Sequence, residues 1–232
     1  MMRMLWIAPI LLGLSVSACD GGHKLMPNTE EYFKAHGIIQ GQPNELRIGG
    51  TLFRFPMVKR IEIMSEGNII KRQASQAILF MVPSNYLNAP YNDSPLKDTE
   101  IRIEIDSRDF TSPEDADIYA QQQAWSIQRD NYELGLREYI PILRPDGSPR
   151  GTLRYQSFNE HTPSGSLVTY DCRTRYDDQL KRNVAEPDIC SCSFTFKNKL
   201  RISYFFNGST QLSNWRLIHQ QVVKSINSWV VE

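Results

Sequence analysis

CSCSFTFKNKLRISYFF at residues 190–206 and SNWRLIHQQVVKSINSWVV at residues 213–231 are the two segments that decide the fold. The first predicts a β-hairpin that turns at residues 197–199. The second predicts an amphipathic helix from Asn214 to about Val230, with Ser213 as its N-cap. Its apolar side chains recur at steps of three and four residues, which is the strongest periodic signal in the chain: Trp215, Ile218, Val222, Ile226 and Trp229. This helix should lie on the sheet and close the core.

The sequence before this hairpin is also rich in strand signals. Residues 139–143 and 152–158 flank a turn signal at residues 145–149, and residues 167–173 predict a further strand. Five shorter β-like segments occupy the first half of the chain: 46–48, 51–55, 58–64, 77–82 and 101–105.

A second helix is predicted in the middle of the chain. Ser112 can act as an N-cap, Pro113 suits the first helical position, and Glu114 and Asp115 favour the positive end of the helix dipole. The apolar spacing extends this helix to about Arg129. The order of strands, helix, strands and helix predicts an α+β fold with a largely antiparallel sheet and two main helices, one central and one C-terminal.

The N-terminus has the layout of an export signal. Arg3 is followed by a short apolar core at residues 5–14 and by small residues before Cys19. About ten apolar residues are too few to span a bilayer, which needs roughly 20. Residues 1–18 are therefore predicted to be a signal peptide, residues 19–45 a lipidated N-terminus and tether with a short helix at 30–35, and residues 46–232 a globular domain.

Val16-Ser17-Ala18-Cys19 resembles the lipobox of bacterial lipoproteins. The resemblance implies a diacylglyceryl thioether on Cys19, cleavage before it, and acylation of the new amino group by a chain such as palmitate. Several acyl chains give stable anchoring, because each buried methylene contributes about 0.8 kcal/mol. The resemblance thus implies a protein that is lipid-anchored to a cell membrane and faces the periplasm. Asp20 resembles an inner-membrane retention signal, and the sequence leaves the inner and the outer membrane both open.

Composition and motifs exclude several classes of function. Without the signal peptide the chain has 25 basic and 26 acidic residues, so it lacks the basic excess of a nucleic-acid-binding protein. It has no phosphate-binding glycine loop and no dinucleotide fingerprint. The four histidines show no metal-ligand spacing: His23, His36, His161 and His219. We therefore expect no cofactor, no metal and no catalytic residue.

Three cysteines remain after Cys19, and an exported protein favours a disulfide. Cys190 and Cys192 lie two apart on a predicted strand, roughly 6.5 to 7 Å from each other, which does not suit a direct bond. The favoured pair is Cys172 with Cys190, and Cys192 is the alternative partner. Three thiolates on a metal ion would be a different use of the same cluster.

Two loops are the candidate partner-binding surfaces. A disulfide between Cys172 and Cys190 would pin residues 173–189 at both ends, and pre-ordering lowers the entropic cost of binding. Residues 83–98 form the second candidate. A stapled loop that serves only stability is the alternative interpretation. The candidate contact residues are Arg175, Tyr176, Asp177, Asp178, Tyr86 and Tyr91.

The C-terminal forty residues resemble immunity lipoproteins that accompany phospholipase effectors of the type VI secretion system. The resemblance lies in the hairpin of residues 190–206, the Phe205-Phe206-Asn207 step and the helix from Asn214-Trp215 to Ser228-Trp229. It implies a non-enzymatic protein that binds an incoming toxin, a lipase, and covers its active site. No binding residues carry over from the family. An accessory structural lipoprotein of an envelope or secretion assembly is the alternative, and an envelope enzyme is the third hypothesis.

Overall fold

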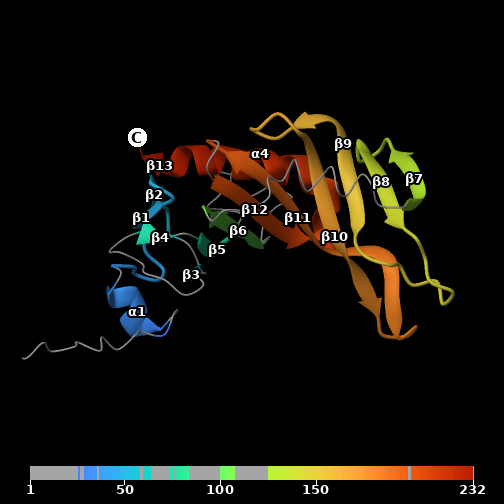
Figure 1. Ribbon diagram of the computed structural model, residues 1–232, viewed down its shortest axis with the longest axis horizontal. Coiled ribbons are helices and arrows are strands. Elements are labelled where there is room, and N and C mark those ends of the chain that lie inside the picture. Colours follow the sequence, from blue (N-terminus) through green and yellow to red (C-terminus); the bar gives the residue numbers. More distant parts are fainter. Residues whose placement is uncertain are drawn as a thin grey trace, which may run out of the picture.

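A computed structural model describes residues 26, 29–35, 37–57, 60–63, 74–75, 77–83, 100–107, 125–197 and 200–231. Its main element is a nine-stranded antiparallel sheet (Figure 1). In spatial order the strands are β3 (Arg60–Ile63), β5 (Ala77–Pro83), β6 (Glu100–Asp106), β12 (Leu200–Asn207), β11 (Arg182–Phe196), β10 (Leu167–Asp177), β9 (Leu153–His161), β8 (Leu136–Pro141) and β7 (Trp125–Asn131).

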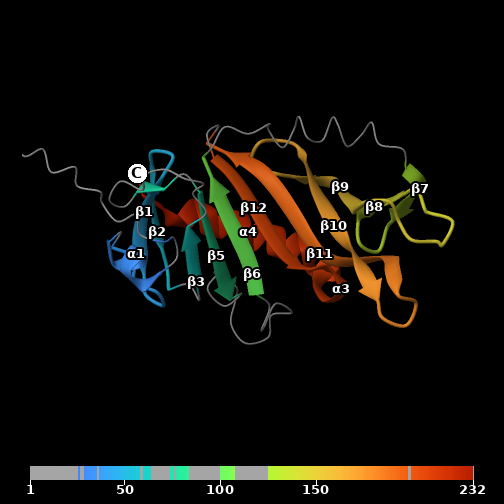
Figure 2. The same ribbon diagram turned by 60° about the horizontal axis from the view of Figure 1, so that its bottom comes forward.

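One helix covers one face of this sheet. The helix α4 (Trp215–Trp229) crosses behind the central strands in Figure 2. All five apolar side chains of the predicted stripe are buried, as are the alternate residues Ile202, Tyr204 and Phe206 of β12. Alternation on the strands and three-four spacing on the helix thus bring two apolar surfaces together, as the sequence predicts.

A smaller sheet closes one end of the core. It contains β13 (Val230–Val231), β2 (Thr51–Phe55), β1 (Asn44–Ile48) and β4 (Ala74–Ser75). β13 follows α4 directly and pairs with β2, so that Trp229 contacts the ring of Phe55. The short helix α1 (Glu30–Ala35) lies where the sequence predicts it, and Tyr32 joins the core cluster.

The prediction of a central helix is wrong at the C-terminal end of that helix. Residues 125–129 were expected to be helical, but they belong to the edge strand β7. Pairing with β8 brings Arg129 within 2.6 Å of Glu138, and the Asn131 amide donates to the same carboxylate. These contacts cross between two strands of a hairpin, and the helical spacing of residues along one strand cannot show them. The rest of the predicted helix, residues 112–124, lies outside the described residues.

The approach to α4 also differs from the prediction. Ser213 is not the N-cap; instead the chain turns through α3 (Gly208–Gln211) and the 3-10 helix η2 (Leu212–Asn214) before α4 begins. The Asn207 side chain caps α3 by accepting a hydrogen bond from the Thr210 backbone N–H. The extra turns bury Leu212, and an amphipathic stripe that starts at Trp215 does not reveal them.

Candidate partner-binding site

Strands β10 and β11 continue beyond the sheet that holds them. The pairing of β10 with β9 runs to Cys172 opposite Leu153, and the pairing of β11 with β12 runs to Ile189 opposite Asn207. Residues 173–189, here called the hairpin extension, pair with each other. They project from the sheet as the two-stranded orange ribbon in Figure 1. The expectation of an irregular loop at 173–189 is therefore wrong, because the strands simply carry on past their neighbours.

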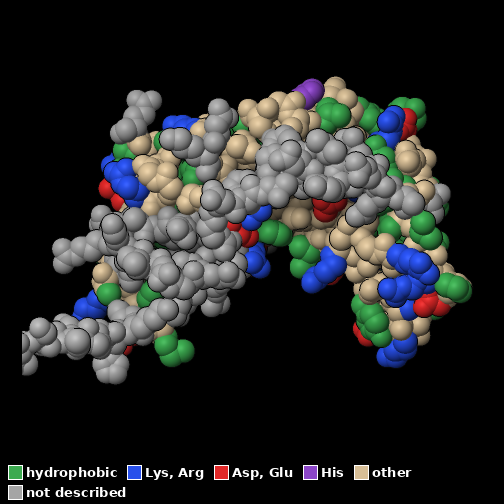
Figure 3. All heavy atoms as spheres, in the orientation of Figure 1, with side chains coloured by type: hydrophobic (Ala, Val, Ile, Leu, Met, Phe, Trp, Pro, Cys, Tyr) green, Lys and Arg blue, Asp and Glu red, His purple; other side chains and the backbone are tan. Residues whose placement is uncertain are grey.

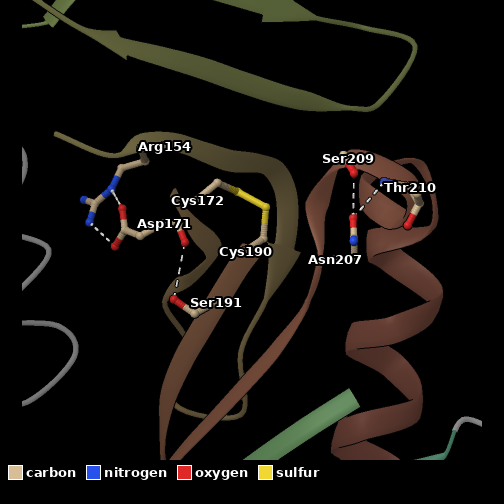
Figure 4. Close-up of a disulfide and its surroundings, with 8 residues drawn as sticks. All are labelled: Arg154, Asp171, Cys172, Cys190, Ser191, Asn207, Ser209 and Thr210. Carbon is tan, nitrogen blue, oxygen red and sulfur yellow. Dashed lines mark hydrogen bonds and ion pairs between the residues drawn. A yellow bond between two sulfur atoms is a disulfide. The ribbon is translucent and has the colours of Figure 1, made fainter. Parts of the chain in front are cut away.

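A disulfide joins the two strands where the extension leaves the sheet. Cys172 and Cys190 are directly opposite in the register, and their Cα atoms are 4.0 Å apart (Figure 4). This is the favoured pairing, so Cys192 is not the disulfide partner and lies buried beside the bond. With two of the three sulfurs bonded to each other, the three-thiolate metal site is excluded. The described residues contain no group of three or more His, Cys, Asp or Glu side chains that could hold a metal ion.

The helix α3 packs against this disulfide. A Cβ atom added to Gly208 would lie 2.5 Å from the Cys190 Sγ and 3.0 Å from the Cβ of Pro187. Only glycine allows so close an approach. Figure 4 shows the Asn207 cap of α3 beside the cross-linked strands. The base of the extension is thus held covalently within the hairpin and sterically by α3.

One face of the hairpin extension carries its paired charges. The Arg173 Nη2 lies 2.8 Å from Asp188, and the Arg175 Nη2 lies 2.8 Å from Glu186. Arg175 also contacts Asp177, two residues along the same strand. Residues 173–189 contain four basic and four acidic side chains, so the extension has no net charge. Each exposed ion pair adds little stability, but here two neighbouring ion pairs connect the same two strands.

The opposite face is poor in charge. In the antiparallel register, Thr174 lies opposite Pro187 and Tyr176 lies opposite Asn183, so these residues share the face of the disulfide. The pairing shifts register on both sides of Thr174, which leaves extra residues on β11. Such bulges increase strand twist and accommodate a proline, which has no N–H to donate. Tyr176 is 53% exposed on this face.

The tip of the extension is a turn ordered by Asp177. Its Oδ1 accepts the backbone N–H groups of Gln179 and Leu180, both at 2.9 Å. These bonds, first that from Leu180, and the nearby Arg175 hold the pKa of the Asp177 carboxyl below its usual range. Lys181 completes the turn at a φ of 52°, a left-handed conformation. The turn presents Leu180, which is 55% exposed.

A second turn supports the tip from the side. Residues 145–149 form the turn that the sequence predicts, closed by the Arg144 N–H to the Ser148 carbonyl. A Cβ on Gly147 would lie 2.7 Å from the Arg182 Nη1, so this turn packs against the guanidinium. The Ser148 hydroxyl and backbone N–H, with Arg182 and Arg144 further away, lower the pKa of Asp146. The extension is therefore braced at its tip as well as at its base.

The structure sorts the predicted contact residues into two groups. It brings Arg175, Tyr176, Asp177 and Asp178 together on the extension. Arg175 and Asp177 engage other residues of the extension, whereas Tyr176 projects into solvent. The remaining predicted positions, Tyr86, Tyr91 and Cys19, lie outside the described residues. Sequence reasoning missed Leu180, and the available signal was a lone apolar residue within a polar turn.

The buried histidine belongs to the core. The His219 Nδ1 is 2.9 Å from the Tyr204 hydroxyl, which lies 2.8 Å from that of Tyr170. Burial lowers the pKa of His219, and a hydrogen bond with the backbone of His161 opposes that shift. This is the hydrogen-bonded structural histidine that the sequence suggests. His161 itself is exposed, and His23 and His36 lie outside the described residues.

No protein-family model matches the chain, and no curated protein sequence does. Two solved structures resemble it weakly. Smlt3025, an immunity protein of the Stenotrophomonas maltophilia type IV secretion system, is 16% identical with a TM-score of 0.43, over 83% of this chain and 94% of that one. The Neisseria meningitidis iron-regulated outer membrane lipoprotein FrpD is 14% identical with a TM-score of 0.43, over 82% and 93%. None of the described helices is long and apolar enough to cross a membrane.

Proposed function

We propose that this chain is a lipid-anchored immunity protein that binds an antibacterial effector in the periplasm and blocks its active site. The effector is a phospholipase delivered by a type VI secretion system. The chain acts by binding and not by catalysis. The anchor is the acylated Cys19, and the segment that follows it lets the domain reach a partner at the membrane surface.

The observation that carries this proposal is the hairpin extension. A free two-stranded ribbon in water is at best marginally stable. This one is cross-linked at its base, packed against α3, and braced by the turn at 145–149. Such order lowers the entropic cost of association, which suits a surface used for tight binding.

Anchoring supports the proposed target. A phospholipase acts on the bilayer, so a lipid-anchored inhibitor is held on the surface that the enzyme must reach. Confinement of both molecules raises their effective concentration relative to free diffusion. The lipobox resemblance and the ordered extension thus point to the same task.

Growth protection tests the proposal. The effector encoded beside this gene would be directed to the periplasm of a sensitive host, with and without this chain. We expect the chain to restore growth, and to do so equally when the exposed His161 is replaced by alanine. Failure to protect, together with an envelope-assembly defect on deletion of the gene, would instead support an accessory structural lipoprotein.

Cell fractionation tests the anchor separately. A Cys19→Ser variant should leave the membrane fraction or retain residues 1–18, whereas the wild-type chain should be membrane-bound and begin at Cys19. Mass spectrometry of the N-terminal peptide distinguishes the two forms. A Cys192→Ala variant is the matched control, because Cys192 is a buried residue of the folded domain. Unchanged membrane binding and processing of Cys19→Ser would contradict the anchor.

A further inference from the structure

The hairpin extension differs between its two faces in a way that specifies the partner. The Arg173–Asp188 and Arg175–Glu186 pairs occupy one face. Thr174, Pro187 and Tyr176 occupy the other, and Leu180 lies at the tip. We infer that the extension enters an apolar cleft of its partner, with Tyr176 and Leu180 as the buried anchors. This inference rests on the proposed function and deepens it.

The shape of the extension requires a concave partner. Five residues from Cys172 to the turn at Asp177 span roughly 17 Å at about 3.3 Å per residue. A stable interface buries about 800 Å² on each partner and uses about 20 to 30 residues. A flat partner that meets the extension end-on would touch only the turn at residues 177–182. A cleft that receives the ribbon contacts both strands and the braced turn at 145–149 as well.

The charges of the extension argue against an electrostatic partner. Its net charge is zero, and the arginines Arg173 and Arg175 already have carboxylates within 2.8 Å. A cleft can therefore cover this face without leaving either arginine unpaired. The other two basic side chains, Lys181 and Arg182, follow Asp177 and Asp178 in the same turn, so the extension offers no basic excess to a polyanionic or strongly acidic partner.

The apolar side chains supply the favourable contacts. Tyr176 and Leu180 are each more than half exposed, and they are the most exposed large apolar side chains of the extension, ahead of Ile189 at 40%. Aromatic anchors in desolvated pockets dominate many interfaces. The cleft that fits a protruding tyrosine and leucine is apolar, as is a cleft that accepts acyl chains. An extension seated there would exclude the substrate of a lipid hydrolase directly.

Binding to the purified effector encoded by the neighbouring gene tests the inference. The test variant is Tyr176→Ser with Leu180→Ser. The matched control is Tyr132→Ser with Phe158→Ser, an exposed aromatic pair whose ring centroids are 5.7 Å apart. Phe158 lies on β9 toward the end remote from Leu153, the residue opposite Cys172. Circular dichroism would verify that both double variants are folded.

We expect the test variant to bind at least about 100-fold more weakly, since fully burying one large apolar side chain gives on the order of 10- to 100-fold in affinity. The control should stay within about 2-fold of wild type. Raising the salt concentration from 50 to 500 mM should change the wild-type Kd by less than about 3-fold. Inhibition of the effector on a soluble short-chain phospholipid should be competitive.

The outcomes separate the two proposals. If the wild-type chain protects cells but the test variant binds as tightly as the control, the cleft inference is wrong and the immunity function stands. Non-competitive inhibition, or a Kd that weakens 10-fold or more with salt, would also overturn the inference alone. If the wild-type chain neither binds nor protects, both proposals fail.

Discussion

The inner and outer parts of strands β10 and β11 are held in place by different physical means. Inside the sheet, side chains such as Tyr170 and Phe194 are buried beneath α4. Beyond Cys172 and Cys190, the described residues give these two strands no third strand and no long helix as a neighbour. They depend on a disulfide, on cross-strand ion pairs and on an ordered turn. The difference teaches that burial fixes the inner part, whereas covalent and local bonds must fix the outer part.

The largest expected effect comes from α4, the helix that buries the inner part of these strands. Trp215 is 1% exposed, contacts the ring of Tyr170, and donates its Nε1–H to the Leu134 carbonyl at 2.8 Å. Trp215→Ala should lower the free energy of unfolding by about 3 to 5 kcal/mol through the cavity it leaves. Urea denaturation measures this. Tyr132→Ala, at an 81% exposed position, should change stability by less than about 0.5 kcal/mol. Equal losses would remove the contrast between buried and exposed positions.

Breaking the disulfide tests the outer part. The bond closes a loop of sequence separation 18, and the chain-entropy model gives about 3 kcal/mol for a loop of this size. Cys172→Ser with Cys190→Ser should lose about this much stability, and limited proteolysis should cut within residues 173–189 faster than in the wild-type chain. Cys192→Ala should keep the Cys172–Cys190 peptide in a non-reducing digest. Equal rates of cleavage within residues 173–189 in the double variant and in the wild-type chain would contradict the dependence of the extension on the disulfide.

Acid should lower the stability of the packing between α4 and the inner part of the strands, because His219 of α4 is buried there. Burial lowers its folded pKa below the ordinary 6.5, whereas the backbone of His161 and the charge of Glu160 raise it, and the Tyr204 hydroxyl lies 2.9 Å from its Nδ1. Below pH 6.5 the unfolded chain therefore binds more protons, and stability falls as pH falls, by up to about 1.4 kcal/mol per pH unit.

The comparison of two variants isolates this contribution. His219→Gln should flatten the loss of stability between pH 7 and pH 5, as measured by urea denaturation at each pH. His161→Gln, at an exposed position, should keep the wild-type slope. A slope that His219→Gln leaves unchanged would assign the acid sensitivity to other groups.

The smallest expected effect lies at the tip of the extension. Lys181 adopts a φ of 52°, which favours glycine. Lys181→Gly should stabilise the turn by up to about 1 kcal/mol, seen as slower amide exchange at residues 179–182. The same substitution at Lys224, exposed on α4, should instead cost about 1 kcal/mol. Faster exchange in Lys181→Gly would show that the lysine side chain itself holds the turn.

Local sequence patterns predicted correctly those segments whose apolar spacing fits only one kind of secondary structure. The stripe from Trp215 to Trp229 is apolar at helical spacing, and the alternation at 101–105 is apolar at strand spacing, and both are buried as expected. The middle of the chain did not follow this logic. Trp125 to Arg129 fits a helical stripe, but pairing with β8 makes it a strand. The spacing of apolar residues along this segment does not show that it pairs with the next strand.

The candidate site divides in the same way. Cysteine spacing on a strand excluded a Cys190–Cys192 bond and left Cys172 with Cys190, the favoured partner, or with Cys192. The register that sets Cys172 opposite Cys190 decided between them. Nothing in residues 173–189 indicated that both strands would extend past their neighbours. The close packing of Gly208 on Cys190, and of Gly147 on Arg182, arises only when distant segments meet.

By itself the sequence determined the largely antiparallel sheet and the helix that closes the core, because each depends on a period of two or 3.6 residues along adjacent positions. Only the tertiary structure decided that residues 173–189 form a braced, two-faced ribbon and that residues 125–131 form an edge strand. The reason is that both segments form hairpins with the next strand, and the free energy of such pairing depends on cross-strand contacts that the residue spacing along one strand does not specify.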